Sequence, residues 1–286
     1  MSVILRADSL SKRFGGLKAV DAVDLELGEG EILGVIGPNG AGKTTLFSMI
    51  AGSIPPTSGR VLLNGKVISG ASPRRAVHAG VVRTHQIVRP FQNLTVLENV
   101  MVGAIYGKGR PLRARERALE VLDFCALRDR APQLPGGLTL AGRKRLELAR
   151  ALATEPRVLL LDEVIAGVNP VEALQMADLI RSVREKRGLS IILIEHVMPA
   201  VMRLSDRVIV LDAGKKIAEG TPQQVVKDAR VIAAYLGESA SATEAAAREA
   251  ESTPTPASGS RAATRPTPPS NPTPFSTPKK DPGERQ

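Results

Sequence analysis

The sequence has few cysteines and aromatic residues. Cys125 is the only cysteine among 286 residues, which excludes an internal disulfide. This cysteine lies in an apolar helical stretch, so we expect a buried structural thiol. Aromatic residues make up 2% of the chain and tryptophan is absent. The core must therefore be built from leucine, isoleucine, valine and alanine.

Long apolar runs are also missing. No stretch approaches the ~18 residues that a transmembrane helix needs, and the charged residues 1–8 do not resemble a signal peptide. These absences predict a chain that is soluble by itself. The net charge of +10 is compatible with a nucleic acid, an anionic membrane surface or a nucleotide as the binding partner.

The composition changes at about Gly237. Residues 238–286 hold nine of the 21 prolines, many Ser, Thr and Ala residues, and equal numbers of acidic and basic side chains. Such a segment buries too little apolar surface to offset its loss of chain entropy. We therefore predict one folded domain at residues 1–237 and a disordered tail at residues 238–286.

The folded part alternates between strand and helix patterns. Continuous apolar runs, which are typical of parallel strands buried on both faces, lie at residues 32–36, 158–161, 191–194 and 207–211. Segments with helical periodicity, residues 171–186 and 198–204, lie between the last three of these runs. These patterns predict an α/β fold with a mostly parallel core sheet.

Two further parts complete the predicted fold. Strand-like segments at residues 3–8 and 23–27, with a hairpin at Asn64-Gly65, predict an N-terminal antiparallel β part. The middle of the chain is rich in helix signals, among them a capping box from Thr95 to Glu98. We expect an inserted α-helical subdomain at about residues 87–154.

One motif carries most of the functional prediction. The sequence Gly-Pro-Asn-Gly-Ala-Gly-Lys-Thr-Thr matches the phosphate-binding loop G-x-x-x-x-G-K-[ST] and joins an expected strand to an expected helix. The unpaired N–H groups and the positive dipole end of a helix N-terminus favour an anion there. We predict that Lys43 reaches the β- and γ-phosphates and that Thr44 binds Mg²⁺. The predicted nucleotide-binding residues of the loop are Gly37, Pro38, Asn39, Gly40, Ala41, Gly42, Lys43, Thr44 and Thr45.

Acidic and imidazole side chains follow two of the expected strands. Asp162 and Glu163 end the run at 158–161, so we predict that Asp162 holds Mg²⁺ and that Glu163 polarises the attacking water. His196 follows the run at 191–194 and is predicted to donate to the γ-phosphate. Gln86 is either a contact to Mg²⁺ or water, or an ordinary polar loop residue.

The order of these motifs resembles that of an ABC-type ATPase, over nearly all of residues 3–236. The resemblance implies a P-loop ATPase fold with ATP and Mg²⁺ as cofactors. It implies that Phe14 stacks on adenine, that Gln86 is catalytic and links Mg²⁺ to the helical subdomain, and that residues 166–169 form the D-loop. It also makes Lys43, Glu163 and His196 catalytic.

The segment Leu138-Thr139-Leu140-Ala141-Gly142 stands where that family has its Leu-Ser-Gly-Gly-Gln signature. The family implies that its residues Thr139, Leu140, Ala141 and Gly142 contact the ATP of a partner subunit. Thr139 keeps the hydroxyl, whereas Leu140 and Gly142 depart from the pattern. Two further departures are Val164 for a proline and Asn169 for an aspartate.

The departures are similar to those of ATP-binding subunits of branched-chain amino-acid importers. The segments 13–20, 161–170, 194–198 and 219–237 carry this likeness, much of which importers for amides or urea share. The resemblance implies a head-to-tail dimer with a second ATP-binding subunit, which is a copy or a homologue. It also implies membrane permeases that dock near residues 86–106, an indirect periplasmic solute-binding protein, and a peripheral location on the cytoplasmic face of the plasma membrane.

Two alternatives stay open at this point. A soluble ABC-type ATPase would use the charge of +10 to hold a nucleic acid or a ribosome, although few aromatic residues are available for base stacking. A subunit with a weakened signature would bind nucleotide but hydrolyse it poorly.

Overall fold

The computed structural model describes residues 2–84, 89–107 and 111–236, which contain two β-sheets. The larger sheet has the strand order β10-β9-β3-β8-β7-β6. Its pairs are parallel except for β10 with β9. Its strands are β3 (Ile32–Ile36), β6 (Val81–Arg83), β7 (Val158–Asp162), β8 (Ser190–Ile194), β9 (Arg207–Asp212) and β10 (Lys215–Gly220).

The strands of the parallel sheet are buried on both faces, as their continuous apolar runs predict. In β7, Leu159 and Leu161 enter one hydrophobic core while Val158 and Leu160 enter another. Strand β8 alternates in the same way. Because side chains of a strand alternate between faces, each run supplies both cores at once. Strand β10, which is partly exposed at the sheet edge, gives no such signal and is absent from the prediction.

The smaller sheet is antiparallel and has the order β2-β1-β4-β5. Its strands are β1 (Val3–Phe14), β2 (Leu17–Gly28), β4 (Ser58–Leu63) and β5 (Lys66–Val67). The predicted hairpin is confirmed, because Leu63 pairs with Lys66 around Asn64 and Gly65, both at positive φ. Strands β1 and β2 are longer than predicted, since register shifts interrupt their alternation.

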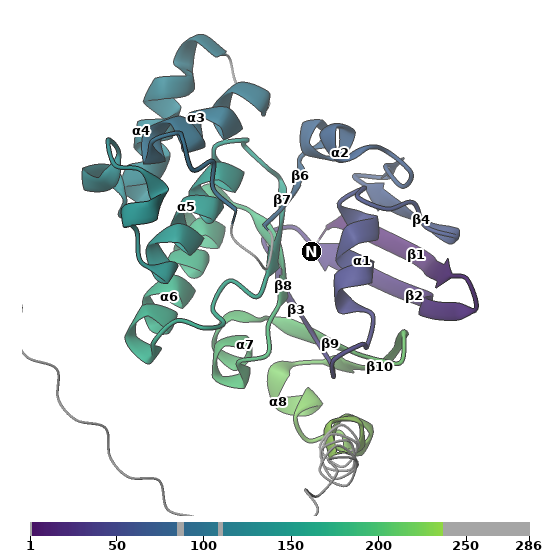
Figure 1. Ribbon diagram of the computed structural model, residues 1–286. Helices are drawn as coiled ribbons and strands as arrows, with labels where there is room; N and C mark the ends of the chain where they lie inside the picture. The colour runs from purple at the N-terminus through teal and green to yellow at the C-terminus, as the bar shows by residue number, and fades with distance from the viewer. Residues whose placement is uncertain (1, 85–88, 108–110, 237–286) are drawn as a thin grey trace, which may run out of the picture. The chain divides into compact units, whose positions relative to one another are not determined.

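Helix α1 (Lys43–Ile50) lies between the two sheets. Its buried Leu46 and Phe47 share one core with apolar side chains of both sheets, and Figure 1 shows α1 beside β1 and β2. The helix is thereby packed against both sheets. The phosphate-loop motif at its N-terminus consequently sits on a rigid element.

A second group of helices lies on the opposite side of the parallel sheet; in Figure 1, α5 and α6 are nearer to β7 and β8, and α3 and α4 pack beyond α5. The predicted capping box at the start of α3 is confirmed, since the Thr95 side chain accepts from the Glu98 N–H. Cys125 is buried, as expected. The helices are α2 (Pro73–Ala79), α3 (Val96–Tyr106), α4 (Ala114–Phe124), α5 (Leu140–Leu152), α6 (Pro170–Arg187), α7 (Met198–Leu204) and α8 (Pro222–Val225), with short 3₁₀ segments at Pro111–Arg113, Arg128–Arg130 and Pro135–Gly137. None of the helices in the described part of the chain is long and apolar enough to cross a bilayer.

Candidate functional site

The loop between β3 and α1 is shaped by three glycines in the left-handed region. Gly37, Gly40 and Gly42 have φ values of 147°, 76° and 98°. A Cβ at Gly37 would overlap the carbonyl oxygen of Leu211, and one at Gly42 would overlap that of Ala19. Only glycine fits these two positions without displacing backbone. The loop therefore brings the N–H groups of the first turn of α1 to one place.

Lys43 is the first residue of α1, and 6% of it is exposed. Its Nζ donates to the carbonyl oxygens of Gly37, at 2.7 Å, and Pro38, at 2.8 Å. The ammonium is thus held inside the curve of the loop. Phosphate oxygens entering that curve would offer it charged acceptors, which form stronger hydrogen bonds than carbonyls.

A pocket of about 580 Å³ lies at this loop, within the size range of small-molecule sites. Lining residues from the loop meet residues from four other parts of the sequence there. Among the predicted site residues, the pocket is lined by Phe14, Asn39, Gly40, Ala41, Gly42, Lys43, Thr44, Thr45, Glu163 and His196. The fold brings these residues together although they span most of the chain.

Phe14 lies at the end of β1 with 49% of its surface exposed. The Nζ of Lys12 stands 5.3 Å from the centre of its ring. The Lys12 ammonium also donates to the Pro55 carbonyl oxygen at 2.7 Å. An exposed aromatic ring at the pocket edge can take a flat heterocycle, so its position is compatible with the predicted adenine contact.

Glu163 and His196 contact each other at the ends of neighbouring parallel strands. The His196 Nε2 and Glu163 Oε1 atoms are 2.8 Å apart. Glu163 has a φ of 51°, an uncommon conformation for a side-chain-bearing residue, and its N–H donates to the Ile194 carbonyl oxygen. This turn takes Glu163 out of the direction of β7, so that its carboxylate lies in the loop pocket while Asp162 stays buried.

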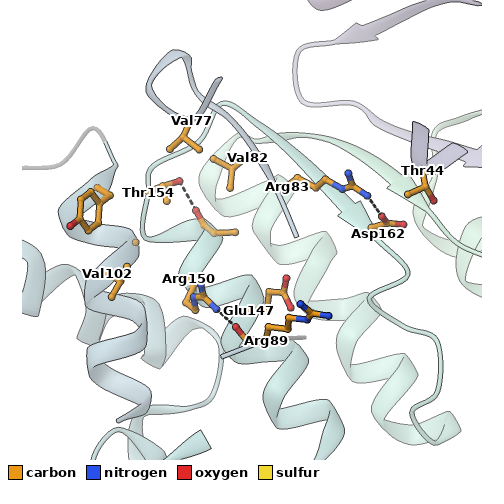
Figure 2. A pocket seen from close by; sticks show the side chains of 13 residues that line it. Thr44, Val77, Val82, Arg83, Arg89, Val102, Glu147, Arg150, Thr154 and Asp162 are labelled. Atoms are coloured by element: carbon orange, nitrogen blue, oxygen red, sulfur yellow. Dashed lines mark hydrogen bonds and ion pairs between the residues drawn. The ribbon is translucent and has the colours of Figure 1, made fainter. Parts of the chain in front are cut away.

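Asp162 faces a different neighbour. Its carboxylate is 1% exposed, and its Oδ2 accepts from Nη2 of Arg83 at 2.6 Å. The second oxygen, Oδ1, is buried and has no hydrogen-bond partner among the described residues. Asp162 and Thr44 both line a second pocket of about 620 Å³ between β6 and helices α3 and α5 (Figure 2).

Three charged side chains that contact Asp162 or the backbone after it are missing from the sequence prediction: Arg83, Lys144 and Glu195. The Lys144 Nζ donates to the carbonyl oxygens of Glu163, at 2.8 Å, and Ala166. The Glu195 Oε1 accepts from the Ile165 N–H at 2.7 Å. Both side chains therefore hold the backbone that follows Asp162. For Arg83 and Glu195 the available signal was that each charge lies at the end of an apolar run, whereas Lys144 lies between Arg143 and Arg145 and gave no such signal.

Burial shifts the pKa of two of these side chains. Desolvation lowers the pKa of Lys144, against the opposing influence of Glu195 and Glu163. Desolvation raises the pKa of Glu195 to about 7, although the Ile165 N–H and the Lys144 ammonium act in the opposite direction. Glu195 is fully buried, and its Oε2 has no partner among the described residues.

The residues aligned with the signature lie elsewhere. Thr139 caps α5, because its Oγ1 accepts from the Gly142 N–H at 3.1 Å. Thr139, Ala141 and Gly142 line a separate pocket of about 200 Å³, and Leu140 is exposed. The signature residues do not line either pocket at the phosphate loop. In one chain, the structure therefore does not unite the signature with the loop.

Asn169, the last residue of the expected D-loop, caps α6 in a capping box with Glu172. Since asparagine caps helices as well as aspartate does, the exchange at this position preserves the start of α6. Gln86 lies outside the described residues, so its predicted role remains a prediction.

The sequence also matches known proteins. Residues 20–166 match the family model described as "ABC transporter". The chain is 40% identical over 250 residues to the high-affinity branched-chain amino acid transport ATP-binding protein LivG of Escherichia coli K12, with 82% of this chain and 98% of LivG covered. The chain belongs to the ABC transporter ATP-binding family. Residues 215–241 additionally match the model "Branched-chain amino acid ATP-binding cassette transporter".

Solved ABC cassettes share the fold. The ADP conformation of the cassette MJ1267 matches with a TM-score of 0.76 and 33% identity, covering 83% of this chain and 100% of that one. The dimeric bacterial cassette MJ0796 matches with a TM-score of 0.69 and 25% identity, covering 77% of this chain and 99% of that one. These matches confirm the predicted P-loop ATPase fold and the likeness to ABC ATPases.

Family membership establishes the general activity. The protein is an ATP-binding subunit of an ABC transporter, and such subunits bind nucleotide and hydrolyse ATP to power transport. The alternative of a nucleic-acid ATPase is not favoured by these relatives. The roles of the individual site residues stay predictions.

Proposed function

We propose that this protein powers the import of branched-chain amino acids, or of a related amide or urea solute, by hydrolysing ATP. The observation that carries the proposal is the 40% identity to LivG over nearly the whole length of that protein, together with the C-terminal match at residues 215–241. The pockets at the phosphate loop supply a place for the nucleotide.

In the proposed site, the phosphate loop binds the nucleotide. The loop N–H groups and Lys43 hold the β- and γ-phosphates, and Phe14 stacks on the adenine. Thr139 to Gly142 of a partner subunit approach the γ-phosphate from the other side. Glu163 accepts a proton of the attacking water, and His196, at 2.8 Å from Glu163, holds that carboxylate in place and contacts the γ-phosphate.

The residues present fit Mg²⁺. The buried Oδ1 of Asp162 lacks a hydrogen-bond partner in the described part of the chain, and Thr44 and Asp162 line the same pocket. No group of three or more His, Cys, Asp or Glu side chains forms a metal cage within the described residues. Mg²⁺ is usually held by one or two carboxylates together with phosphates and waters. Thr44 and Asp162, with Gln86, would hold the ion, which would neutralise charge on the phosphates.

We further propose a dimer at the cytoplasmic face of the membrane. The cassette MJ0796 is dimeric, and the separation of the signature from the phosphate loop leaves each site of a single chain incomplete. Exposed Phe91, Ile105 and Tyr106 belong to the segment 86–106, near which we expect permease subunits to dock. A periplasmic binding protein would supply the solute. Residues 238–286 are proposed to be a tail beyond the ATPase domain at residues 1–237.

The variant Glu163→Gln tests this proposal. It should bind ATP as the parent does, lose turnover, and accumulate as a dimer in ATP, because glutamine keeps the shape of the side chain but cannot accept the proton. Gel filtration with ATP and a phosphate-release assay measure both effects. Turnover equal to that of the parent would remove Glu163 from its role. Cells that carry the variant in place of the parent should also lose uptake of labelled leucine, isoleucine and valine; loss of urea uptake instead would reassign the solute.

A further inference from the structure

A buried arginine outside the predicted site contacts the proposed magnesium ligand. Arg83 is the last residue of β6, and its side chain is 9% exposed. Its Nη2 donates to Asp162 Oδ2 at 2.6 Å, and its Nη1 donates to Ser48 Oγ at 2.8 Å. Figure 2 shows the guanidinium extending along the pocket wall to Asp162, with Thr44 nearby. One side chain thus ties β6, β7 and α1 together.

The guanidinium uses one carboxylate oxygen and leaves the other. Oδ2 of Asp162 is occupied by Arg83, whereas Oδ1 is buried without a partner among the described residues. A carboxylate fixed at one oxygen cannot rotate freely about its terminal bond. The planar, rigid donor fork of arginine suits this task better than the flexible ammonium of lysine. Arg83 therefore fixes the direction in which Oδ1 points.

The second hydrogen bond fixes the position of the pair relative to the nucleotide. Ser48 lies on α1 and donates its own hydroxyl to the Thr44 carbonyl oxygen at 2.7 Å. Thr44 is the proposed hydroxyl ligand of Mg²⁺. The ring of Phe47, also on α1, lies 5.9 Å from the Arg83 guanidinium carbon. The same arginine therefore holds the carboxylate of β7 at a set distance from the helix that carries Thr44.

Burial explains why a cation is required here. A carboxylate that is 1% exposed is costly to ionise without a partner of opposite charge. Arg83 supplies this charge, with its Nη2 atom 2.6 Å from Oδ2 of Asp162. This ion pair uses Oδ2 of Asp162 and leaves Oδ1, the oxygen proposed to bind the metal.

We propose that Arg83 is a positioning residue for magnesium: it holds the Asp162 carboxylate by Oδ2, ties it to α1 through Ser48, and presents Oδ1 to the ion. This inference rests on the proposed role of Asp162 as a ligand of Mg²⁺. Partners that orient metal ligands typically contribute about 10- to 100-fold to metal affinity.

The test compares ATP affinity with Mg²⁺ and with EDTA, by isothermal titration calorimetry on the full chain. The ratio of the ATP affinity with Mg²⁺ to the ATP affinity with EDTA measures how much the metal contributes to binding, and it does not require hydrolysis. Arg83→Gln should lower this ratio by about tenfold or more, with the metal-free affinity nearly unchanged. Arg83→Lys should restore part of the ratio, because it keeps the charge but not the fork. A ratio in Arg83→Gln that equals or exceeds that of the parent would overturn the proposal.

Controls separate this inference from the proposed function. Arg128→Gln makes the same chemical change at an exposed ion pair with Asp123 and should leave the ratio unchanged. Asp162→Asn should lower the ratio as Arg83→Gln does. If Asp162→Asn leaves the ratio unchanged, the metal assignment itself is wrong; if only Arg83→Gln does so, the role of Arg83 is wrong while the site stands. The metal-free affinity and the circular dichroism spectrum show that each variant is folded.

Discussion

The buried carboxyl of Glu195 makes a quantitative prediction about stability and pH. Desolvation raises its pKa from an ordinary value near 4.5 to about 7, with the Ile165 N–H and the Lys144 ammonium opposing the shift. Between these two values the folded chain binds a proton that the unfolded chain releases. The free energy of unfolding therefore falls as pH rises through this window, and the loss is complete above pH 7.

Glu195→Gln removes this dependence, because an amide is neutral at every pH. Each pKa unit corresponds to about 1.4 kcal/mol, so the stability of the variant relative to the parent should rise by about 2 to 3 kcal/mol between pH 5 and pH 8. The new amide N–H₂ group would take the place of an oxygen that lacks a partner among the described residues. This adds a cost that is the same at every pH, so the readout is how the stability difference between variant and parent changes with pH.

Urea unfolding followed by circular dichroism measures the effect, since the chain has no tryptophan for fluorescence. Glu98→Gln is the matched control. Hydrogen bonds from the Thr95 N–H and hydroxyl lower the pKa of Glu98, so that carboxyl is ionised throughout pH 5 to 8. Its variant should differ from the parent by a constant amount. A constant difference for Glu195→Gln would refute the argument that its ionisation is penalised by burial.

Two further predictions concern the nucleotide loop and the helical layer. Lys43→Ala should lose most of its affinity for ATP, because a charge held against the Gly37 and Pro38 carbonyl oxygens is removed; calorimetry that still showed tight binding would count against the loop assignment. Gly103→Ala should destabilise the fold by about 1–3 kcal/mol, since its Cβ would overlap the Arg150 carbonyl oxygen and push α3 from α5. Gly16→Ala, whose Cβ would meet no atom within 4 Å, is the control for urea unfolding, and equal midpoints would contradict the packing argument.

The sequence was most informative where local pattern and burial agree. The runs that became β3, β7 and β8 were predicted within a residue of their ends, because a strand buried on both faces must be apolar throughout. The Asn64-Gly65 turn was predicted because its backbone needs two positive φ values. Strand β10 was missed, since a half-exposed edge strand has neither signal.

Tertiary pairing at the site could not be predicted from the same patterns. The proximity of Glu163 and His196 follows from the parallel register of β7 and β8, which places Asp162 beside Ile194. A ligand-binding role for strand ends was therefore foreseeable, whereas the 2.8 Å contact between these side chains was not. The contact depends on the positive φ of Glu163, a backbone conformation that glutamate does not favour.

Arg83 and Glu195 were invisible as functional residues for a physical reason. Each looks like the ordinary polar end of an apolar strand, and a strand end is usually solvated. In the folded chain Arg83 contacts the side chain of Asp162, and Glu195 accepts from the Ile165 N–H. A buried charge persists only where another group compensates it. Arg83 is paired with Asp162. The raised pKa of Glu195 favours its neutral form, and the nearby Lys144 ammonium offsets the charge of its ionised form. Buried charges are exceptions to an apolar core and reduce stability, so they indicate where the fold holds a functional segment in a fixed position. That place is the backbone that carries both Asp162 and Glu163.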